Sequence, residues 1–258
     1  MRRLCIALMM MLTLSACVST RQFADLEFAP PEGEFSLLVM RPDINVGQVS
    51  TGGMVTPNAE WTEAATSHVL AALMEQQSAR GGKVDVLDKR DGLTGIDAQQ
   101  IADLERLHGA VGNSIVLHHY YRARLPNKRG MGLDFTLGEN AVRLGQATGY
   151  DYALFLYAED RIVGDGRKAL QVLGIAGCFI GFCAPNIGGG GQLAYASLVD
   201  LNSGEVVWFN LLQTGSQVAG IKFGDIRTEE GAEQMVERLL GRMKPGKAVR
   251  ERMKEEAK

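Results

Sequence analysis

Two apolar runs that flank a tight turn constrain the fold of this chain more than any other feature. Residues 193–199 and 205–212 each have the length and apolar content of a buried strand, and a turn at 202–204, Asn-Ser-Gly, separates them. Such a pair predicts an antiparallel β-hairpin. Residues 152–157 form another short apolar run, which is typical of a strand buried on both faces. The chain is therefore expected to build a β-sheet around these segments.

Helical and strand-like patterns alternate along the rest of the chain. Apolar residues recur every three or four positions in several segments, as on one face of a helix. Thr136 and Glu139 have the spacing of a capping box, in which both side chains satisfy free amides at a helix start. In chain order we expect a strand over 35–40, a glycine-rich loop over 43–57, a helix from 58 to 80, a strand over 83–88, a helix over 101–118, a basic loop over 120–132, a helix from 139 to 149 and a helix over 228–243.

This order of elements indicates an α/β fold with α+β character. We expect a mixed sheet of about four to five strands flanked by helices, with a C-terminal β-hairpin followed by a helix. The 258 residues are enough to bury a large core. The 27 basic and 30 acidic residues give a net charge of −3, which excludes a general nucleic-acid binder because phosphate contacts need a basic surplus.

The first 17 residues have the three parts of a bacterial secretory signal. Arg2 and Arg3 supply positive charge, residues 4–14 form an apolar stretch, and small residues precede Cys17. Residues 14–17, Leu-Ser-Ala-Cys, resemble the lipobox of bacterial lipoproteins. The resemblance implies cleavage before Cys17, diacylglycerol on its thiol and an acyl chain on its new amino group. An ordinary secretory signal with a chance cysteine is the alternative.

The lipobox divides the chain into four parts. Residues 1–16 are the signal peptide, 17–34 a lipid-anchored tether, 35–243 the periplasmic α/β domain and 244–258 a charged tail expected to form a solvated helix. As a flexible segment, the tether would reach on the order of 20–25 Å.

The expected location follows from the anchor. Several acyl chains hold a protein on a membrane without spanning it. Val18 stands where aspartate is the usual inner-membrane retention signal of Gram-negative lipoproteins, so the resemblance implies the outer membrane, with the domain facing the periplasm.

The second half of the chain resembles a known periplasmic α/β domain. Residues 149–153, Gly-Tyr-Asp-Tyr-Ala, precede the buried strand, and residues 197–208 form the hairpin that ends at Trp208 before a closing helix. This arrangement is similar to the domain of the curli-secretion lipoprotein, the lipoprotein activators of penicillin-binding proteins and the N-terminal domain of the Tol translocation protein. The similarity covers roughly residues 136–240. It implies a fold and a role as adaptor, activator or pore subunit, and it implies no chemistry.

The histidines do not form a recognisable ligand set. His108 and His118 lie about 15 Å apart along a helix axis, which is too far to share one metal ion. We interpret the histidines as partly buried packing residues with a satisfied ring nitrogen, with metal binding as the alternative. The four histidines are His68, His108, His118 and His119.

Other catalytic patterns are also absent from the sequence. Ser203 lies in a turn without the glycine elbow of a hydrolase nucleophile, and the glycines at 188–191 lack the Lys-Ser/Thr of a phosphate-binding loop. Asp151, Glu159 and Asp160 flank a strand and are expected to face water. We therefore expect a protein that is not an enzyme, without catalytic residues, metal or cofactor.

Residues 169–199 contain no charged side chain. Their middle, 172–184, is shorter than a membrane-spanning helix. Three interpretations stay open: a buried apolar segment, which we favour, an exposed patch that contacts a partner or the membrane surface, or part of a membrane-inserting hairpin in an oligomeric pore.

Cys178 and Cys183 are the cysteines that remain after processing, apart from the lipidated one. In the oxidising periplasm they are candidates for a disulfide that closes a small loop. Two buried thiols that pack as small apolar groups are the alternative.

The basic loop gathers cations beside two aromatic residues, within a chain of net negative charge. This composition suits an acidic partner or anionic cell-wall groups, and solvated loop charges are the alternative. The candidate partner-binding residues are Tyr120, Tyr121, Arg122, Arg124, Lys128 and Arg129.

Together these features predict a non-catalytic periplasmic binding or adaptor lipoprotein, tethered to the outer membrane through Cys17. Its partners would be the membrane, through covalent lipid, and an envelope protein, and a homo-oligomer stays open. The alternatives are an oligomeric secretion or pore subunit of the cell envelope and an envelope hydrolase.

Overall fold

The structure is a computed structural model of the whole chain. It describes residues 19–31, 35–80, 82–87, 90–121, 123, 125–126, 128, 132–170, 173, 190–214, 224–241 and 243–256.

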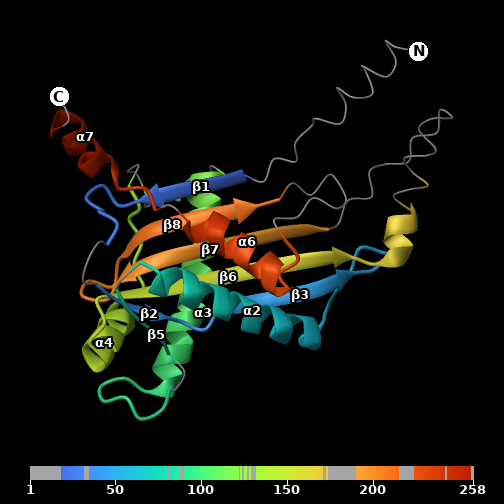
Figure 1. Cartoon of the computed structure of the whole chain (residues 1–258), viewed down its shortest axis with the longest axis horizontal. Coiled ribbons are helices and arrows are strands. Elements are labelled where there is room, and N and C mark those ends of the chain that lie inside the picture. The colour runs from blue at the N-terminus through green and yellow to red at the C-terminus, as the bar shows by residue number, and fades with distance from the viewer. Residues whose placement is uncertain are drawn as a thin grey trace.

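One mixed β-sheet forms the centre of the molecule (Figure 1). Within the described residues it has eight strands, and its longest strand, β6, pairs antiparallel with β7 on one side and parallel with β2 and β3 on the other. The strands are β1 (Ser19–Ala24), β2 (Ser36–Val39), β3 (Asp43–Val49), β4 (Val55–Pro57), β5 (Lys83–Val86), β6 (Tyr152–Val163), β7 (Gly191–Asp200) and β8 (Val206–Gln213).

The mixed α/β fold and the C-terminal hairpin are as predicted. β7 and β8 pair antiparallel, and α6 follows them. The sheet has more strands than the expected four to five, because two segments that read as irregular from the sequence join it.

The first of these segments is residues 43–57, which we expected to be a glycine-rich loop. β3 runs parallel to the second half of β6, and β4 turns back to pair antiparallel with β3. Ile44, Val46 and Val49 are buried, so the segment contributes to the core. Gly47 permits the close pairing, because a Cβ at this position would lie 2.7 Å from Val55 Cγ1.

The second segment lies in the expected tether. Ser19–Ala24 forms β1, which pairs antiparallel with β8 along its whole length and is an edge strand. Its polar side chains bond inward: Thr20 Oγ1 donates to Asn210 Oδ1 at 2.9 Å, and Gln22 Oε1 accepts from the Trp208 indole at 3.2 Å. The sheet therefore includes residues 19–24, which lie before the expected start of the domain at residue 35.

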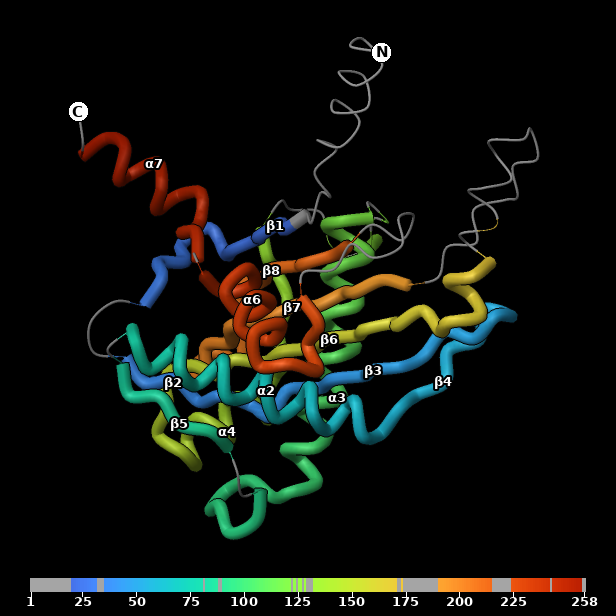
Figure 2. The backbone as a smooth tube through the Cα atoms, turned by 45° about the vertical axis from the view of Figure 1, so that its right-hand side comes forward, coloured from blue at the N-terminus to red at the C-terminus, as the bar shows by residue number. Residues whose placement is uncertain are grey.

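Helices cover both faces of the sheet (Figures 1 and 2). One face packs against α2 (Ala59–Ser78) and α6 (Glu229–Leu240), which also contact each other. The opposite face packs against α3 (Ala98–Ile115), its π-helical continuation η1 (Val116–Tyr120) and α4 (Glu139–Thr148). The sheet therefore separates two apolar cores, one around Trp208 and one around Tyr195.

The predicted capping box at the start of α4 is wrong. The residue that caps this helix is Gly138, and no side chain caps it. Thr136 instead accepts from the Gly138 amide at 2.9 Å and donates to the Gly204 carbonyl at 2.8 Å. The threonine thus fastens the helix start to the turn of the β7–β8 hairpin.

The charged tail forms α7 (Lys247–Glu256), a helix without buried residues, as predicted. The segment before it lies beside the chain that follows β1. The Lys244 amide donates to Gln22 Oε1 at 3.0 Å, and the Gly246 amide donates to the Phe28 carbonyl at 2.8 Å. The tail therefore leaves the domain at the edge that carries β1 (Figure 1).

Candidate functional site

A serine on β7 and a histidine on α3 are hydrogen-bonded in the core between the sheet and the helix. His108 Nε2 lies 2.9 Å from Ser197 Oγ on β7, and the two residues are 3% and 1% exposed. The imidazole stacks on Phe155, with ring centroids 4.7 Å apart. Burial lowers the pKa of His108 from 6.5 to about 3.

This pair does not have the properties of a nucleophile and its base. A base with a pKa of about 3 accepts a proton poorly at neutral pH. Neither side chain is open to a substrate. The bond instead satisfies two buried polar groups, so the interpretation of this histidine as a packing residue is confirmed.

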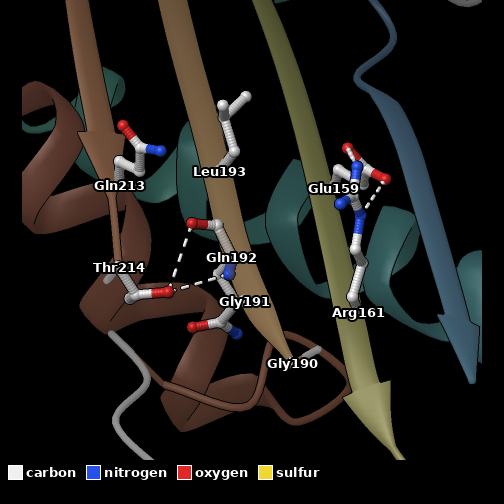
Figure 3. Close-up of a pocket in the computed structure, with 8 residues that line it drawn as sticks. All are labelled: Glu159, Arg161, Gly190, Gly191, Gln192, Leu193, Gln213 and Thr214. Atoms are coloured by element: carbon white, nitrogen blue, oxygen red, sulfur yellow. Dashed lines mark hydrogen bonds and ion pairs between the residues drawn. The ribbon is translucent and has the colours of Figure 1, made fainter. Parts of the chain in front are cut away.

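A small cavity of about 160 Å³ lies where β6 and β8 end and β7 begins (Figure 3). The acid and the base that line it are bonded to each other, with Arg161 Nε donating to Glu159 Oε1 at 2.7 Å. On the other side of the cavity, Thr214 Oγ1 accepts from the backbone amide of Gln192 at 2.8 Å. The lining residues are Glu159, Arg161, Gly190, Gly191, Gln192, Leu193, Gln213 and Thr214.

Behind this cavity, Asp160 departs from its expected exposure. It is fully buried and accepts a hydrogen bond from Gln192 Nε2 at 2.9 Å, while the same amide donates to the Gly224 carbonyl at 2.7 Å. The Gln192 side chain thereby links Asp160 on β6 to the segment that leads into α6, and the carboxylate holds that side chain in place. We assign it a structural role.

The edge of the sheet at β1 carries an aromatic and basic surface. We call it the β1–η1 surface and define it by Arg21, Phe23, Leu117, His119, Tyr120 and Tyr121. Its residues come from the first strand and from the end of the long α3–η1 helix, which lie side by side in Figures 1 and 2.

Aromatic contacts hold β1 against η1. The Phe23 ring lies 4.5 Å from His119 and 5.1 Å from Tyr120, measured between centroids. The Tyr120 hydroxyl donates to the Arg21 carbonyl. The guanidinium of Arg21 lies 5.1 Å from the Phe23 ring, in the range of a cation–π contact.

His119 is the least satisfied polar side chain of this surface. Its Nε2 is buried and has no hydrogen-bond partner within the described residues. Burial, followed by the nearby His118 and Arg21, lowers the pKa of His119 to about 4. The expectation of a satisfied ring nitrogen is therefore wrong for this histidine.

The π-helical turn shapes the end of the surface. The Tyr121 amide donates to the Val116 carbonyl at 3.2 Å, five residues back, and the Leu125 amide donates to His118 Nδ1 at 3.1 Å. Such widened turns occur at functional sites more often than elsewhere in helices. Leu117 and Tyr121 are left 49% and 55% exposed.

The structure describes part of the predicted partner-binding set. Tyr120 packs inward, Tyr121 is exposed and its hydroxyl accepts from Gln213 Nε2 at 2.9 Å, and Lys128 forms an ion pair with Asp134 at 3.3 Å. The predicted residues outside the described part of the chain are Cys17, Arg122, Arg124, Arg129, Cys178 and Cys183.

Sequence reasoning missed Arg21 and Phe23, because residues 19–24 were assigned to the tether. Their alternation with Thr20 and Gln22 is a strand signal, though a short one.

The uncharged stretch 169–199 is described at its two ends and at Leu173. Its C-terminal portion forms most of β7, which is largely buried in the sheet. Residues 174–189 lie outside the described part, so the open alternatives for them stay predictions.

The described residues lack two features that would point to a membrane span or a metal site. No helix among them is both long and apolar enough to cross a membrane. No group of three or more histidine, cysteine, aspartate or glutamate side chains among them is placed to hold a metal ion.

Comparison with known proteins gives structural likeness alone. No family model and no curated protein sequence matches the chain. It is similar to the PelC dodecamer from Paraburkholderia phytofirmans, at 12% identity and a TM-score of 0.36, over 88% of this chain and 100% of that one.

Two further solved structures are similar over 72% of this chain. The C-terminal domain of LpoB from Salmonella enterica is covered to 87%, at 13% identity and a TM-score of 0.29. Lipoprotein GNA1162 from Neisseria meningitidis is covered to 84%, at 14% identity and a TM-score of 0.28. Because these scores are low, the likeness carries no argument about function.

Proposed function

We propose that the chain is a lipid-anchored, non-catalytic binding module of the bacterial envelope, held at the outer membrane through Cys17 with its domain facing the periplasm. One observation carries the proposal. Cys17, the lipobox cysteine, stands two residues before β1, and β1 is hydrogen-bonded into the sheet. The anchor would therefore continue directly into the fold.

This continuity sets how far the domain reaches from the membrane. Two residues span at most about 7 Å, in place of the 20–25 Å expected for a flexible tether. A domain held this close meets its partners at the membrane surface. Confinement to that layer raises its effective concentration toward other envelope components, which is how a module without chemistry can act.

The geometry of the polar clusters favours binding over catalysis. The buried Ser197–His108 pair has no access for a substrate, and its histidine is a weak base. In the cavity at the strand ends, Glu159 is held by Arg161. Each cluster is bonded within itself, so neither presents a free acid, base or nucleophile.

The partner side of the proposal rests on the basic loop. The loop leaves η1 at the edge that carries β1, so its cations would face an acidic envelope protein close to the membrane. Lys128 is engaged with Asp134, which leaves the arginines of the loop as the candidate contacts.

Replacing the lipobox cysteine tests the anchor. We expect Cys17→Ser to abolish acylation, seen by mass spectrometry of the N-terminal peptide, and to move the protein out of the outer-membrane fraction. Cys5→Ser, which removes the cysteine of the apolar signal segment, is the matched control and should fractionate as the wild type does. A Cys17→Ser protein that stays unchanged in the outer-membrane fraction would contradict the proposal.

A further inference from the structure

We propose that the β1–η1 surface lies on the anionic headgroup layer of the membrane that carries the anchor. The inference rests on the proposed lipid anchor and adds the face through which the domain contacts the bilayer. Its basis is the position of the anchor two residues before β1, the exposed Arg21 of β1, and the exposed side chains of η1, whose Tyr120 contacts Arg21.

The position of Arg21 places a cation within reach of the headgroups. Four peptide units separate it from Cys17, a span of at most about 14 Å in extended chain. The interfacial layer of a bilayer is on the order of 5–8 Å thick on each side. A domain anchored at Cys17 therefore holds this arginine within about 14 Å of the anchor, a distance that lets it reach the phosphate layer while β1 stays in the sheet.

The register of β1 directs this arginine toward η1. Arg21 and Phe23 are two residues apart and lie on one side of the strand, where both contact η1 aromatics. Thr20 and Gln22 alternate with them and bond to Asn210 and Trp208 in the sheet. The polar bonds of β1 thus face the domain, and its cation stands with the aromatic group.

The exposed side chains of η1 match a membrane interface. Leu117 and Tyr121 are each about half exposed at the end of the helix. Tyrosine is enriched at bilayer interfaces, where its ring meets acyl chains and its hydroxyl meets water. Arginine can lay its apolar stem along such a surface while its charge stays with the phosphates.

Two acidic groups near this edge are paired with other cations. Glu27, on the segment after β1, pairs with Arg252 at 2.8 Å, and Asp134 pairs with Lys128. No ion pair neutralises Arg21 among the described residues, where its contacts are with aromatic rings. Its charge is therefore available to an anionic lipid.

A pair of tryptophan variants on one helix tests the inference. Leu117→Trp places the probe on the surface, and Leu107→Trp, 42% exposed on the same helix, is the matched control about 15 Å away along the axis. The lipidated full-length mature protein is reconstituted into vesicles of phosphatidylethanolamine and phosphatidylglycerol whose acyl chains carry bromine. Quenching of each variant is measured relative to the parent, which contains Trp61 and Trp208.

We expect the added tryptophan at position 117 to be quenched at least about twofold more than that at position 107, since an interfacial ring contacts the acyl chains. Arg21→Glu, or replacement of phosphatidylglycerol by phosphatidylcholine, should reduce this difference. Equal quenching at both positions, with the protein still on the vesicles, would overturn the inference and leave the anchor standing. Quenching at position 117 that is indifferent to both changes would overturn the role of anionic lipid.

Two other outcomes have separate meanings. If the lipidated protein does not stay with the vesicles at all, the proposed anchor fails together with the inference. If position 117 is shielded by a co-purifying protein and not by lipid, cross-linking at that position captures protein, and the lipid inference is wrong.

Discussion

The histidine in the middle of the α3–η1 helix and the one at its end differ in their hydrogen bonding. His108, in the middle, is fully buried and its ring nitrogen meets Ser197 at 2.9 Å. His119, at the π-helical end, has a buried nitrogen without a partner in the described residues, and exposed Leu117 and Tyr121 lie near it in the chain. One helix thus serves as a packing element in its middle and as a surface at its end.

This difference separates stability from candidate function. A buried group with all its bonds made adds to the folded state and has nothing left to offer a ligand. An edge that combines unsatisfied or exposed groups with a nearby anchor is where binding can occur. Substitutions in the middle of the helix should therefore change stability, and substitutions at its end should leave stability nearly unchanged.

The largest effect is expected at the closest contact of the helix middle with the sheet. A Cβ on Gly112 would lie 2.4 Å from the Tyr195 ring, so Gly112→Ala should destabilise the protein by about 3 kcal/mol through overpacking. A Cβ on Gly109 would meet nothing within 4 Å, so Gly109→Ala should be neutral or stabilise by up to about 1 kcal/mol. Urea unfolding measures both. Equal losses at the two glycines would show that α3 does not pack as described.

Exchanging each histidine for phenylalanine compares the two environments directly. His108→Phe leaves the buried Ser197 hydroxyl unpaired and should lower the free energy of unfolding by about 2 kcal/mol. His119→Phe removes a buried nitrogen that has no partner among the described residues, and it should raise the free energy of unfolding by up to about 1 kcal/mol. Thermal unfolding at pH 7 measures the sign of each change in stability. A His108→Phe protein more stable than the wild type would show that the two histidines do not differ in this way.

Acid should destabilise the protein through the same histidines. The pKa of His108 is about 3 in the folded state against 6.5 unfolded, so the unfolded chain binds the proton first as the pH falls below 6.5. The contribution of His108 to stability is fully present above that pH. Its loss should lower the free energy of unfolding by about 2 kcal/mol between pH 7 and pH 5. His119 adds a loss of the same sign, reduced by its partial exposure to solvent.

Urea midpoints across this range provide the measurement. The slope of stability with pH should flatten in His108→Phe, which lacks the buried imidazole. A variant with the slope of the wild type would place the acid sensitivity elsewhere.

The smallest effect is expected at the Lys128–Asp134 ion pair beyond η1, in which only the aspartate is largely exposed. Lys128→Ala breaks a 3.3 Å pair with Asp134, whose side chain is 82% exposed, so stability should fall by less than about 1 kcal/mol. Thermal unfolding in low and high salt measures the pair. A loss above that size would mean that the start of the basic loop is part of the packed structure.

Local sequence patterns predicted the elements whose structure depends on residues within the same segment. The β7–β8 hairpin and the amphipathic helices belong to this group, since their apolar periodicity and turn residues lie within each segment. The position of His108 on the apolar face of α3 could also be read from its spacing.

Segments stabilised by pairing escaped prediction. β1 is short and polar, and its strand character comes from β8 and from the bonds of Thr20 and Gln22. β6 extends past Tyr157 through charged residues, because Glu159 pairs with Arg161 while Asp160 bonds to Gln192. A single sequence cannot assign such cross-strand partners, so the β1–η1 surface could not be found before the sheet was known.

The most direct test of the account is hydrogen exchange of the β1 amides in the lipidated mature protein. We expect the amides of Ser19–Ala24 that donate to β8 to be protected to a degree similar to those of β8, because the strand is part of the sheet. Exchange at the rate of an unstructured peptide, with β8 still protected, would contradict this expectation. The anchor would then be a loose tether, and the edge of the sheet would not be held at the membrane.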